Sequence, residues 1–320
     1  MTRKFSTKSI QARLLTDAYF GTVRGISSGM FSDTLDSPTI YTYAGAIFTR
    51  LLEYGYDINN IVNECKIYGI YIKHKDDYLI PITSYAISKD KKIKIKEDNY
   101  QSVSDISSTS LIHNRLNLII PKFNMLGSDE LRSKYFISIK SLKEDEDAKV
   151  IELEDISKKE ERTRTALDYD KKVPIEEKLF SLALIKQNNI EYCVDIEIPD
   201  HYNISNWIGH FGGESTLAEF NINNETPLLN VINSRKSNRY IAISHIALKL
   251  IDDQLICKFG KLKYVIGRIG RIGGWDIKEV CMKKIYACIE PGSIFCVEDS
   301  DKKDFNDNWY INLLNTAIPI

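Results

Sequence analysis

The sequence predicts an α+β fold in two domains, in which strands outnumber helices. Its 320 residues are enough for two domains of ordinary size. Its hydrophobic content of 43% is sufficient for real cores and excludes wholesale disorder. Short apolar runs recur in both halves, on either side of a highly charged stretch, Ser141–Arg162, that we expect to be solvent-exposed and mobile. We therefore place the domains at residues 1–145 and 146–320.

In the first half, a strand, a loop and a helix come first. Ser9–Phe20 has the apolar positions of a strand, and Gly21–Asp36 is a loop rich in Gly, Ser and Thr. Ser37 is predicted to cap a helix with Pro38 in its first position, and Gly55 to end it. The apolar residues of this segment follow helical spacing, namely Ile40, Tyr43, Ala44, Ile47, Leu51 and Leu52.

Strands follow this helix. Lys66–Lys73 and Asp77–Ile82 flank a polar turn and predict a hairpin, and Lys134–Lys140 predicts a further strand. Lys91–Glu97 alternates lysine with isoleucine, which predicts a half-exposed strand with one cationic face. This strand is either a solvated sheet edge, where the lysines prevent pairing with another chain, or a surface that contacts nucleic acid.

The second half contains mostly strand-like runs. Two short helices are expected, at Asn203–Ile208 and Asp304–Asn315. Sheets with few helices, in two halves, fit two ferredoxin-like βαββαβ domains, the second carrying glycine-rich loops. The predicted strands are Leu179–Lys186, Ile190–Ile198, Ser215–Asn221, Arg239–Ile251, Lys261–Ile266, Lys284–Cys288 and Ser293–Val297.

The charge balance argues against a free-standing nucleic-acid-binding protein. The net charge is −1, whereas such proteins tend to be basic overall. Basic and acidic residues are instead concentrated locally, as in Lys91–Lys96 and Glu144–Asp147. This pattern favours a component that contributes one groove to a larger assembly.

Several classes of site and location are not predicted. The six cysteines include no CxxC pair, so we expect reduced thiols and no metal site. We expect no bound cofactor, and the glycine run near the C-terminus lacks the helix pattern of a dinucleotide site. No secretory signal and no stretch of about 18 apolar residues is present. We expect a cytoplasmic protein without membrane contact.

The run Gly267–Asp276 has the residue types of a loop that contacts a polyanion. Glycine allows a ligand to approach the backbone, arginine offers a forked donor to phosphate, and tryptophan offers a face on which a base stacks. The alternative is a tight β-turn with arginines in solvent. The RNA-contacting residues predicted in and before this run are Lys263, Arg268, Arg271, Gly273, Gly274 and Trp275.

A second glycine loop, His210–Ala218, contains Gly212, Gly213 and Glu214, which we also place at the RNA. Phe211 beside them either stacks on a base or is buried as an anchor. The Glu214 carboxylate is expected to accept hydrogen bonds from the amides of its own loop rather than from a base.

Three further arginines are candidates for phosphate contact. Arg162 and Arg164 lie two residues apart, so an extended backbone places them on one face, where they can bind consecutive phosphates. The alternative is a surface ion-pair cluster with Glu160 and Glu161. Arg24 lies in the first loop and is included for its position alone.

Five segments in order resemble one protein family. The series resembles the third subunit of the Cmr complex, in the RAMP superfamily of type III-B CRISPR effectors. The resemblance implies two ferredoxin-like RAMP domains and does more than periodicity to decide that topology. The segments are Pro38–Ile47, Arg162–Tyr169 with the following Glu176–Phe180, His210–Ala218, Gly267–Asp276 and Glu290–Phe295.

The resemblance also implies a function and partners. Such a subunit holds the 5′ handle of the guide RNA (crRNA) in an antiviral ribonucleoprotein, and contacts the large polymerase-like signalling subunit and the backbone RAMP subunits. The present chain departs from the family at Ser215 and Thr216, where relatives often carry a basic residue.

We expect no catalytic residue. Some RAMP relatives cleave RNA with a histidine, but His210, the one histidine beside a predicted contact surface, has the setting of a hydrogen-bonded turn residue. The alternatives are the equivalent subunit of another type III complex, an endoribonuclease that processes the guide precursor, and a structural bridge whose arginines face protein acids.

Overall fold

The computed structural model describes most of the chain. Its described residues form a mixed structure of many strands and few helices, as the sequence predicts. None of their helices is both long and apolar enough to cross a membrane. The described residues are 4–21, 31–32, 34–94, 100–103, 117–121, 134–142, 150–167, 174–186, 189–213, 215–273, 275–276, 281–282, 284–298, 311 and 313–320.

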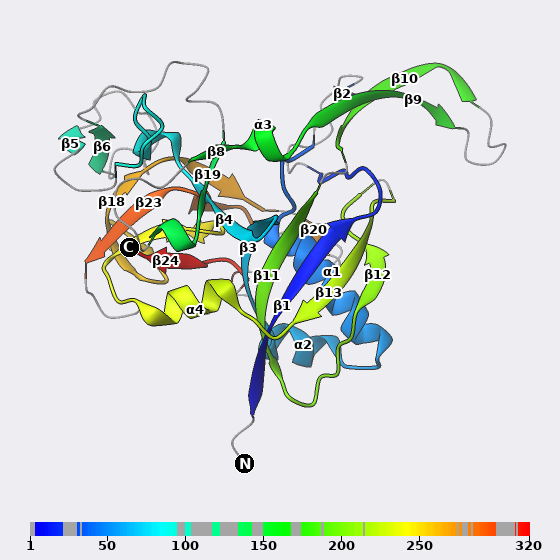
Figure 1. Cartoon of the computed structure of the whole chain (residues 1–320), viewed down its shortest axis with the longest axis horizontal. Coiled ribbons are helices and arrows are strands. Elements are labelled where there is room, and N and C mark those ends of the chain that lie inside the picture. The colour runs from blue at the N-terminus through cyan, green and yellow to red at the C-terminus, as the bar shows by residue number, and fades with distance from the viewer. Residues whose placement is uncertain are drawn as a thin grey trace.

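An eight-stranded sheet organises the first half and extends well into the second (Figure 1). Ile10 shows the pairing, because it lies opposite Val194 on one side and Ile222 on the other, in antiparallel register. The sheet therefore crosses the predicted domain boundary at residues 145 and 146. Its strands, in spatial order, are β12 (Trp207–His210), β13 (Leu217–Asn223), β1 (Phe5–Leu14), β11 (Ile190–Pro199), β3 (Lys66–His74), β4 (Asp77–Ile82), β7 (Tyr135–Ser138) and β8 (Ile151–Glu152).

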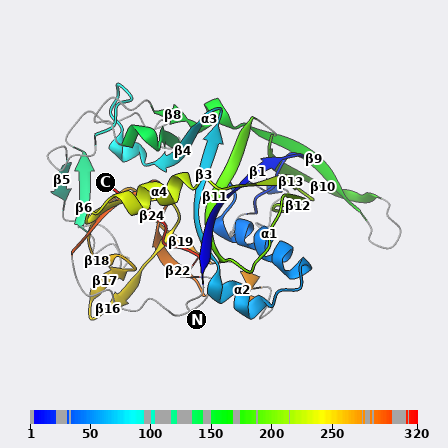
Figure 2. The same cartoon turned by 60° about the horizontal axis from the view of Figure 1, so that its bottom comes forward.

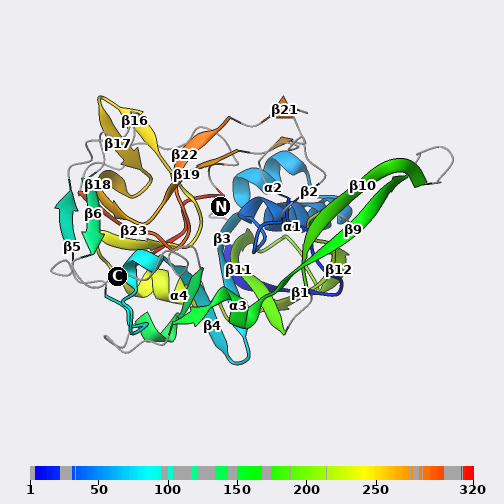
Figure 3. The ribbon, with the colours of Figure 1, turned by 90° about the horizontal axis from the view of Figure 1, so that it is seen from above.

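Two helices, α1 (Ile40–Glu53) and α2 (Ile58–Glu64), lie together on one side of this sheet (Figure 3). Thr39, not Ser37, caps α1, because its hydroxyl accepts a hydrogen bond from the Thr42 amide at 3.2 Å. The predicted apolar stripe is buried apart from Leu52, which remains 44% exposed. An aromatic cluster joins α1 to the sheet through Tyr43, Phe20, Tyr192, Phe211 and Phe220.

From residue 227 onward, the described residues form the helix α4 (Pro227–Ser234) and several further sheets. Figure 2 shows most of the strands that follow α4 at one end of the molecule, with α1 and α2 toward the other. One sheet has the order β16 (Lys249–Ile251), β17 (Gln254–Cys257), β18 (Gly260–Ile266), β23 (Ile294–Glu298), β14 (Arg239–Ala242), β24 (Ala317–Pro319), with β6 (Asn117–Pro121) beside β18 and β5 (Tyr100–Val103) beside β6. The others are β15 (Ile246–Ala247), β22 (Tyr286–Ile289), β19 (Ile269–Ile272), and the pair β20 (Trp275–Asp276), β21 (Cys281–Met282).

A long two-stranded arm projects from the body of the molecule (Figures 1 and 3). It consists of β9 (Lys159–Leu167) and β10 (Pro174–Ile185), with β2 (Phe31–Ser32) beside β10. The start of β9 belongs to the stretch predicted to be a solvated linker.

That linker prediction is wrong for the residues between β8 and the arm. A short helix, α3 (Leu153–Ile156), lies there, and Ile156 is buried. Val150 just before β8 is buried as well. These apolar side chains pack against the body, so the high charge of the stretch did not indicate a wholly exposed segment. Residues 143–149, which include the acidic run, lie outside the described residues.

Two other predicted elements differ from the structure, and a third cannot be compared with it. Asn203–Ile208 is not a helix, because Trp207 pairs with Phe220 across β12 and β13 and stacks on its ring at 4.3 Å. Within the described part of Lys91–Glu97, the sheet contact is a single bridge between Ile93 and Ile87. Most of Asp304–Asn315 lies outside the described residues.

Candidate nucleic-acid interface

A cleft of about 300 Å³ lies where the first-half sheet meets the turns of the second half. Three of the five segments singled out in the sequence line it, represented by Pro38, Arg268 and Glu290. These segments are far apart in the chain, so the fold gathers them at one place. The remaining lining comes from residues 35–40, 69–70, 72, 81–84, 134–136 and 243–245, together with Pro291 and Ser293.

The glycine–arginine run forms part of the wall of this cleft. Its centre is the strand β19, which pairs with β22, and Gly270 lies opposite Cys288. A Cβ atom at Gly267 would collide with the Ser293 hydroxyl, and one at Gly270 with the Glu290 carboxylate. The space these two glycines leave is therefore filled by the chain itself. The expectation that they make room for a ligand backbone is wrong.

The two arginines of the run are both exposed, but only one of them lines the cleft. Arg268 lines the cleft, and its backbone holds the cleft wall together, since its N–H donates to the Ser293 hydroxyl at 3.0 Å and its carbonyl accepts from the Glu290 amide at 3.0 Å. Arg271 lies three residues further on, within β19, and does not line the cleft.

Four other residues of this region were predicted to contact RNA, and the structure describes the side-chain surroundings of only two of them, Lys263 and Gly273. Lys263 is exposed on β18, where the pairing with β23 shifts between Leu262 and Tyr264, and it does not line the cleft. A Cβ atom at Gly273 would lie 3.2 Å from Ile285. Gly274 and the side chain of Trp275 lie outside the described residues.

The second glycine loop packs closely against the backbone at Tyr19. The Gly213 amide donates to the Tyr19 carbonyl at 2.9 Å, and a Cβ atom at Gly212, where φ is 113°, would lie 2.6 Å from the same oxygen. Phe211 is fully buried, with its ring 4.8 Å from that of Tyr43. Stacking of Phe211 on a base is therefore excluded, and these glycines serve close packing. Glu214 lies outside the described residues.

The arginine pair of the arm is separate from the cleft. Arg162 and Arg164 both belong to the strand β9. Arg162 forms ion pairs with Asp17 and with Glu160, the second at 3.4 Å, as the salt-bridge alternative expects. The arm carries this strand outward from the body (Figure 1). The Arg164 side chain and Arg24 lie outside the described residues.

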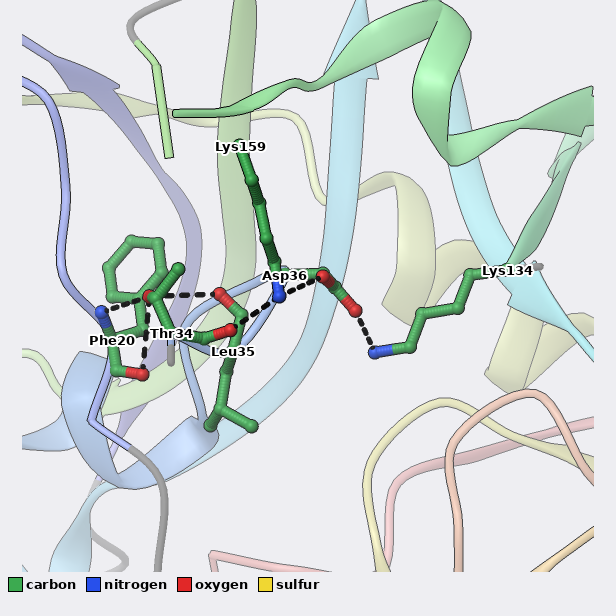
Figure 4. A network of polar contacts seen from close by, with 6 residues as sticks. All are labelled: Phe20, Thr34, Leu35, Asp36, Lys134 and Lys159. Carbon is green, nitrogen blue, oxygen red and sulfur yellow. Dashed lines mark hydrogen bonds and ion pairs between the residues drawn. The ribbon is translucent and has the colours of Figure 1, made fainter. Parts of the chain in front are cut away.

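A polar network that the sequence did not predict stands at the edge of the cleft (Figure 4). The Asp36 carboxylate lies 2.5 Å from Lys134 Nζ and 2.9 Å from Lys159 Nζ. Lys159 also donates to the Thr34 carbonyl at 2.6 Å, and the Thr34 hydroxyl accepts from the Phe20 amide at 2.8 Å. Burial alone would raise the pKa of Asp36, but the two ammonium groups outweigh it and lower that pKa. The network ties the start of the arm to one side of the cleft.

His245 is a second residue that sequence reasoning missed at this site. It is partly buried and lines the cleft. Burial, with a smaller contribution from the Lys134 charge, lowers the pKa of His245 to about 4. Its imidazole is therefore neutral at pH 7, with one donor and one acceptor nitrogen. No pattern of neighbouring residues indicates this role, because the histidine reaches the cleft only through tertiary packing.

Comparison with known proteins finds similarity in structure only. No family model matches the chain, and no curated protein matches its sequence. One chain of a cryo-electron microscopy structure of type III-B Cmr-beta bound to cognate target RNA superposes with a TM-score of 0.57 and 18% identity, over 98% of this chain and 96% of that one. A chain of the same complex bound to cognate target RNA and AMPPnP gives a TM-score of 0.54 and 18% identity, over 90% and 86%. The resemblance predicted from the sequence is thus confirmed for the fold, which is that of a type III-B Cmr-beta chain.

Proposed function

We propose that this chain is a non-catalytic, cytoplasmic RNA-binding subunit of a type III-B CRISPR–Cas ribonucleoprotein. It holds the 5′ handle of the guide RNA and bridges the large signalling subunit to the backbone RAMP subunits in antiviral defence. The observation that carries the proposal is the cleft, where Pro38, Arg268 and Glu290 from three ordered segments meet. The nearly full-length fold similarity to a Cmr-beta chain supports the assignment to the complex.

The strand order supports a ferredoxin-like unit in the first sheet. Taken in chain order, β1, β3, β11 and β13 are the first to fourth strands, and their spatial order is fourth, first, third, second. Helix α1 connects the first strand to the second, as a βαββαβ unit requires. The described residues between β11 and β13 contain no helix, so the second crossover is reduced. We propose two such RAMP domains, the first completed by strands from the second half of the chain.

The position of His210 supports a non-catalytic role. His210 is exposed at the end of the edge strand β12 and does not line the cleft. Incubation of the purified chain with repeat RNA should leave the RNA intact. Cleavage that disappears in the His210→Ala or His245→Ala variant would favour a guide-processing endoribonuclease instead.

Co-purification tests the assignment to a complex. The chain should be tagged in its own cells, and both RNA and protein recovered with it should be sequenced. We expect short RNAs that share one 5′ handle, together with a large polymerase-like subunit and RAMP subunits. Recovery of the chain alone, or with unrelated RNA, would contradict the proposal. Recovery of partners that define another type III complex would favour the equivalent subunit there.

A further inference from the structure

We propose that the cleft binds one unpaired nucleobase of the RNA, and that the His245 imidazole hydrogen-bonds the edge of that base. This inference rests on the proposed RNA-binding function and names the chemical group that the site takes. The cleft, as defined above, is the space lined by residues 35–40, by β3, β4 and β7, and by the turns around His245, Arg268 and Glu290.

The size and walls of the cleft suit a flat ring. Its volume of about 300 Å³ is at the lower end of the range of ligand pockets, roughly 300–1,000 Å³. Such a volume is sufficient for one ring system. Ile70, Ile82 and Phe136 provide apolar surface in its lining. Splayed bases of single-stranded RNA are held in this way, with apolar contacts on their faces and hydrogen bonds on their edges.

The charge of the cleft argues for a base rather than a phosphate. Lys134 and Arg268 are balanced by Asp36 and Glu290, so the formal charges of the lining residues cancel. Lys134 is in addition paired with Asp36 at 2.5 Å. A phosphate subsite needs an excess of cationic groups, whereas an uncharged base does not. Glu290, whose carboxylate lies against Gly270, offers an acceptor to a base amino group.

His245 supplies the polar group that the base would meet. Within the described part of the chain, the imidazole has no hydrogen bond to protein, although its neighbours Ser244 and Asn315 are engaged through their own bonds. The ring is neutral at pH 7 because of its surroundings, so it can both donate and accept. An imidazole that lines the cleft and has no protein partner among the described residues is available to hydrogen-bond a base edge there.

Nucleotide binding to the full chain tests this directly. The probes are AMP, GMP, CMP and UMP, with ribose 5-phosphate and inorganic phosphate as controls. The imidazole resonances of His245, assigned by their loss in His245→Gln, are followed by NMR. We expect a saturable shift with at least one nucleoside monophosphate and none with either control. An equal shift with ribose 5-phosphate or phosphate would show an anion site, and no shift at millimolar nucleotide would also overturn the proposal.

Abasic substitution separates this inference from the proposed function. Single abasic sites are scanned through a single-stranded handle RNA, and binding is compared for the wild type, His245→Gln and a His210→Ala control. A base contact is worth roughly tenfold in affinity, so one abasic position should weaken wild-type binding about tenfold. At that position His245→Gln should cause little further loss, whereas His210→Ala should leave the pattern unchanged. Binding that requires Arg268 but is insensitive to every abasic site would overturn the nucleobase proposal and leave the RNA-binding function intact.

Discussion

An added Cβ atom at Gly267 or at Gly270 would collide with a side chain of the same cleft wall. The two positions differ in how easily the neighbouring atoms can move away. At Gly267, where φ is 139°, an added Cβ would meet the Ser293 side chain and lie 2.9 Å from its Cα atom. At Gly270 it would meet only the Glu290 side chain, whose carboxylate end is flexible. Substitution at the first position therefore requires backbone movement, and at the second only a rotamer change.

We predict that Gly267→Ala lowers the free energy of unfolding by more than about 1 kcal/mol, because both the φ angle and the close approach of Ser293 oppose a side chain. Gly270→Ala should cost less than about 1 kcal/mol but displace the Glu290 carboxylate. Urea unfolding of the two variants measures the difference. Equal losses, or a larger loss at Gly270, would show that the wall is packed otherwise.

A buried carboxylate on β11 fixes helix α4 to the eight-stranded sheet that contains β11. Asp195 accepts hydrogen bonds from the Tyr71 hydroxyl at 2.6 Å and the Leu229 amide at 2.8 Å. Burial raises the pKa of Asp195 to about 6, although these hydrogen bonds lower it. The folded-state pKa exceeds the unfolded value, so the fold favours the protonated form. This contribution to stability is full below about pH 4 and is lost as the pH rises to about 6.

His245 has the opposite dependence on pH. Its pKa of about 4 lies below the unfolded value of about 6.5, so the fold favours the neutral form. That contribution is full above about pH 6.5 and is lost as the pH falls to about 4. Each shift corresponds to roughly 3 kcal/mol, since one pKa unit is about 1.4 kcal/mol. In the wild type the two contributions largely cancel between pH 4 and 6.

Because the two contributions cancel in the wild type, removing either one should change the pH dependence of stability, and the two variants should change it in opposite directions. Relative to the wild type, Asp195→Asn should lose about 2–3 kcal/mol of stability on going from pH 6 to pH 4, because the gain from protonating Asp195 is gone. His245→Gln should gain a similar amount over the same range. Urea titrations at several pH values measure both. Profiles parallel to the wild type in either variant would contradict the pKa shift assigned to that residue.

Local elements were predictable from the sequence, and their arrangement was not. The stripe of Tyr43, Ile47 and Leu51 identified α1, because helical spacing is a property of a short segment. The hairpin of β3 and β4 was likewise indicated by its polar turn. The placement of β1 between β11 and β13 joins residues far apart in the chain, and no local pattern encodes it.

At the candidate site, too, local sequence patterns predicted part of the structure but not the contacts between distant segments. The residue types of the glycine–arginine run identified a region that lines the cleft, but not the reason for its glycines. Gly267 and Gly270 accommodate Ser293 and Glu290, which only tertiary contacts reveal. Asp36 and His245 carry no local signal, since their partners and their burial come from other segments.

The whole molecule is nearly neutral, with a net charge of −1, and offers RNA a cleft without a wide basic field. We predict weak binding of handle RNA by the isolated chain, and a sharp rise in affinity when the large signalling subunit is added. The added subunit would close the groove and raise the effective concentration of each contact. Titration of labelled RNA with and without that subunit decides this. Equal affinities would mean that the chain binds RNA by itself, and the component model would fail.

The most direct test of the proposed RNA-binding role is the salt dependence of handle-RNA binding in Arg268→Ala and Arg271→Ala, singly and together. Arg13→Ala is the matched control, an exposed arginine on β1, paired with Glu219 and outside the cleft. Affinity should fall in both single variants, and the slope of log affinity against log salt should decrease by about 0.7 for each phosphate that the variant no longer binds. The Arg13 variant should behave as the wild type. Unchanged affinity and slope in the double variant would show that the glycine–arginine run does not contact RNA.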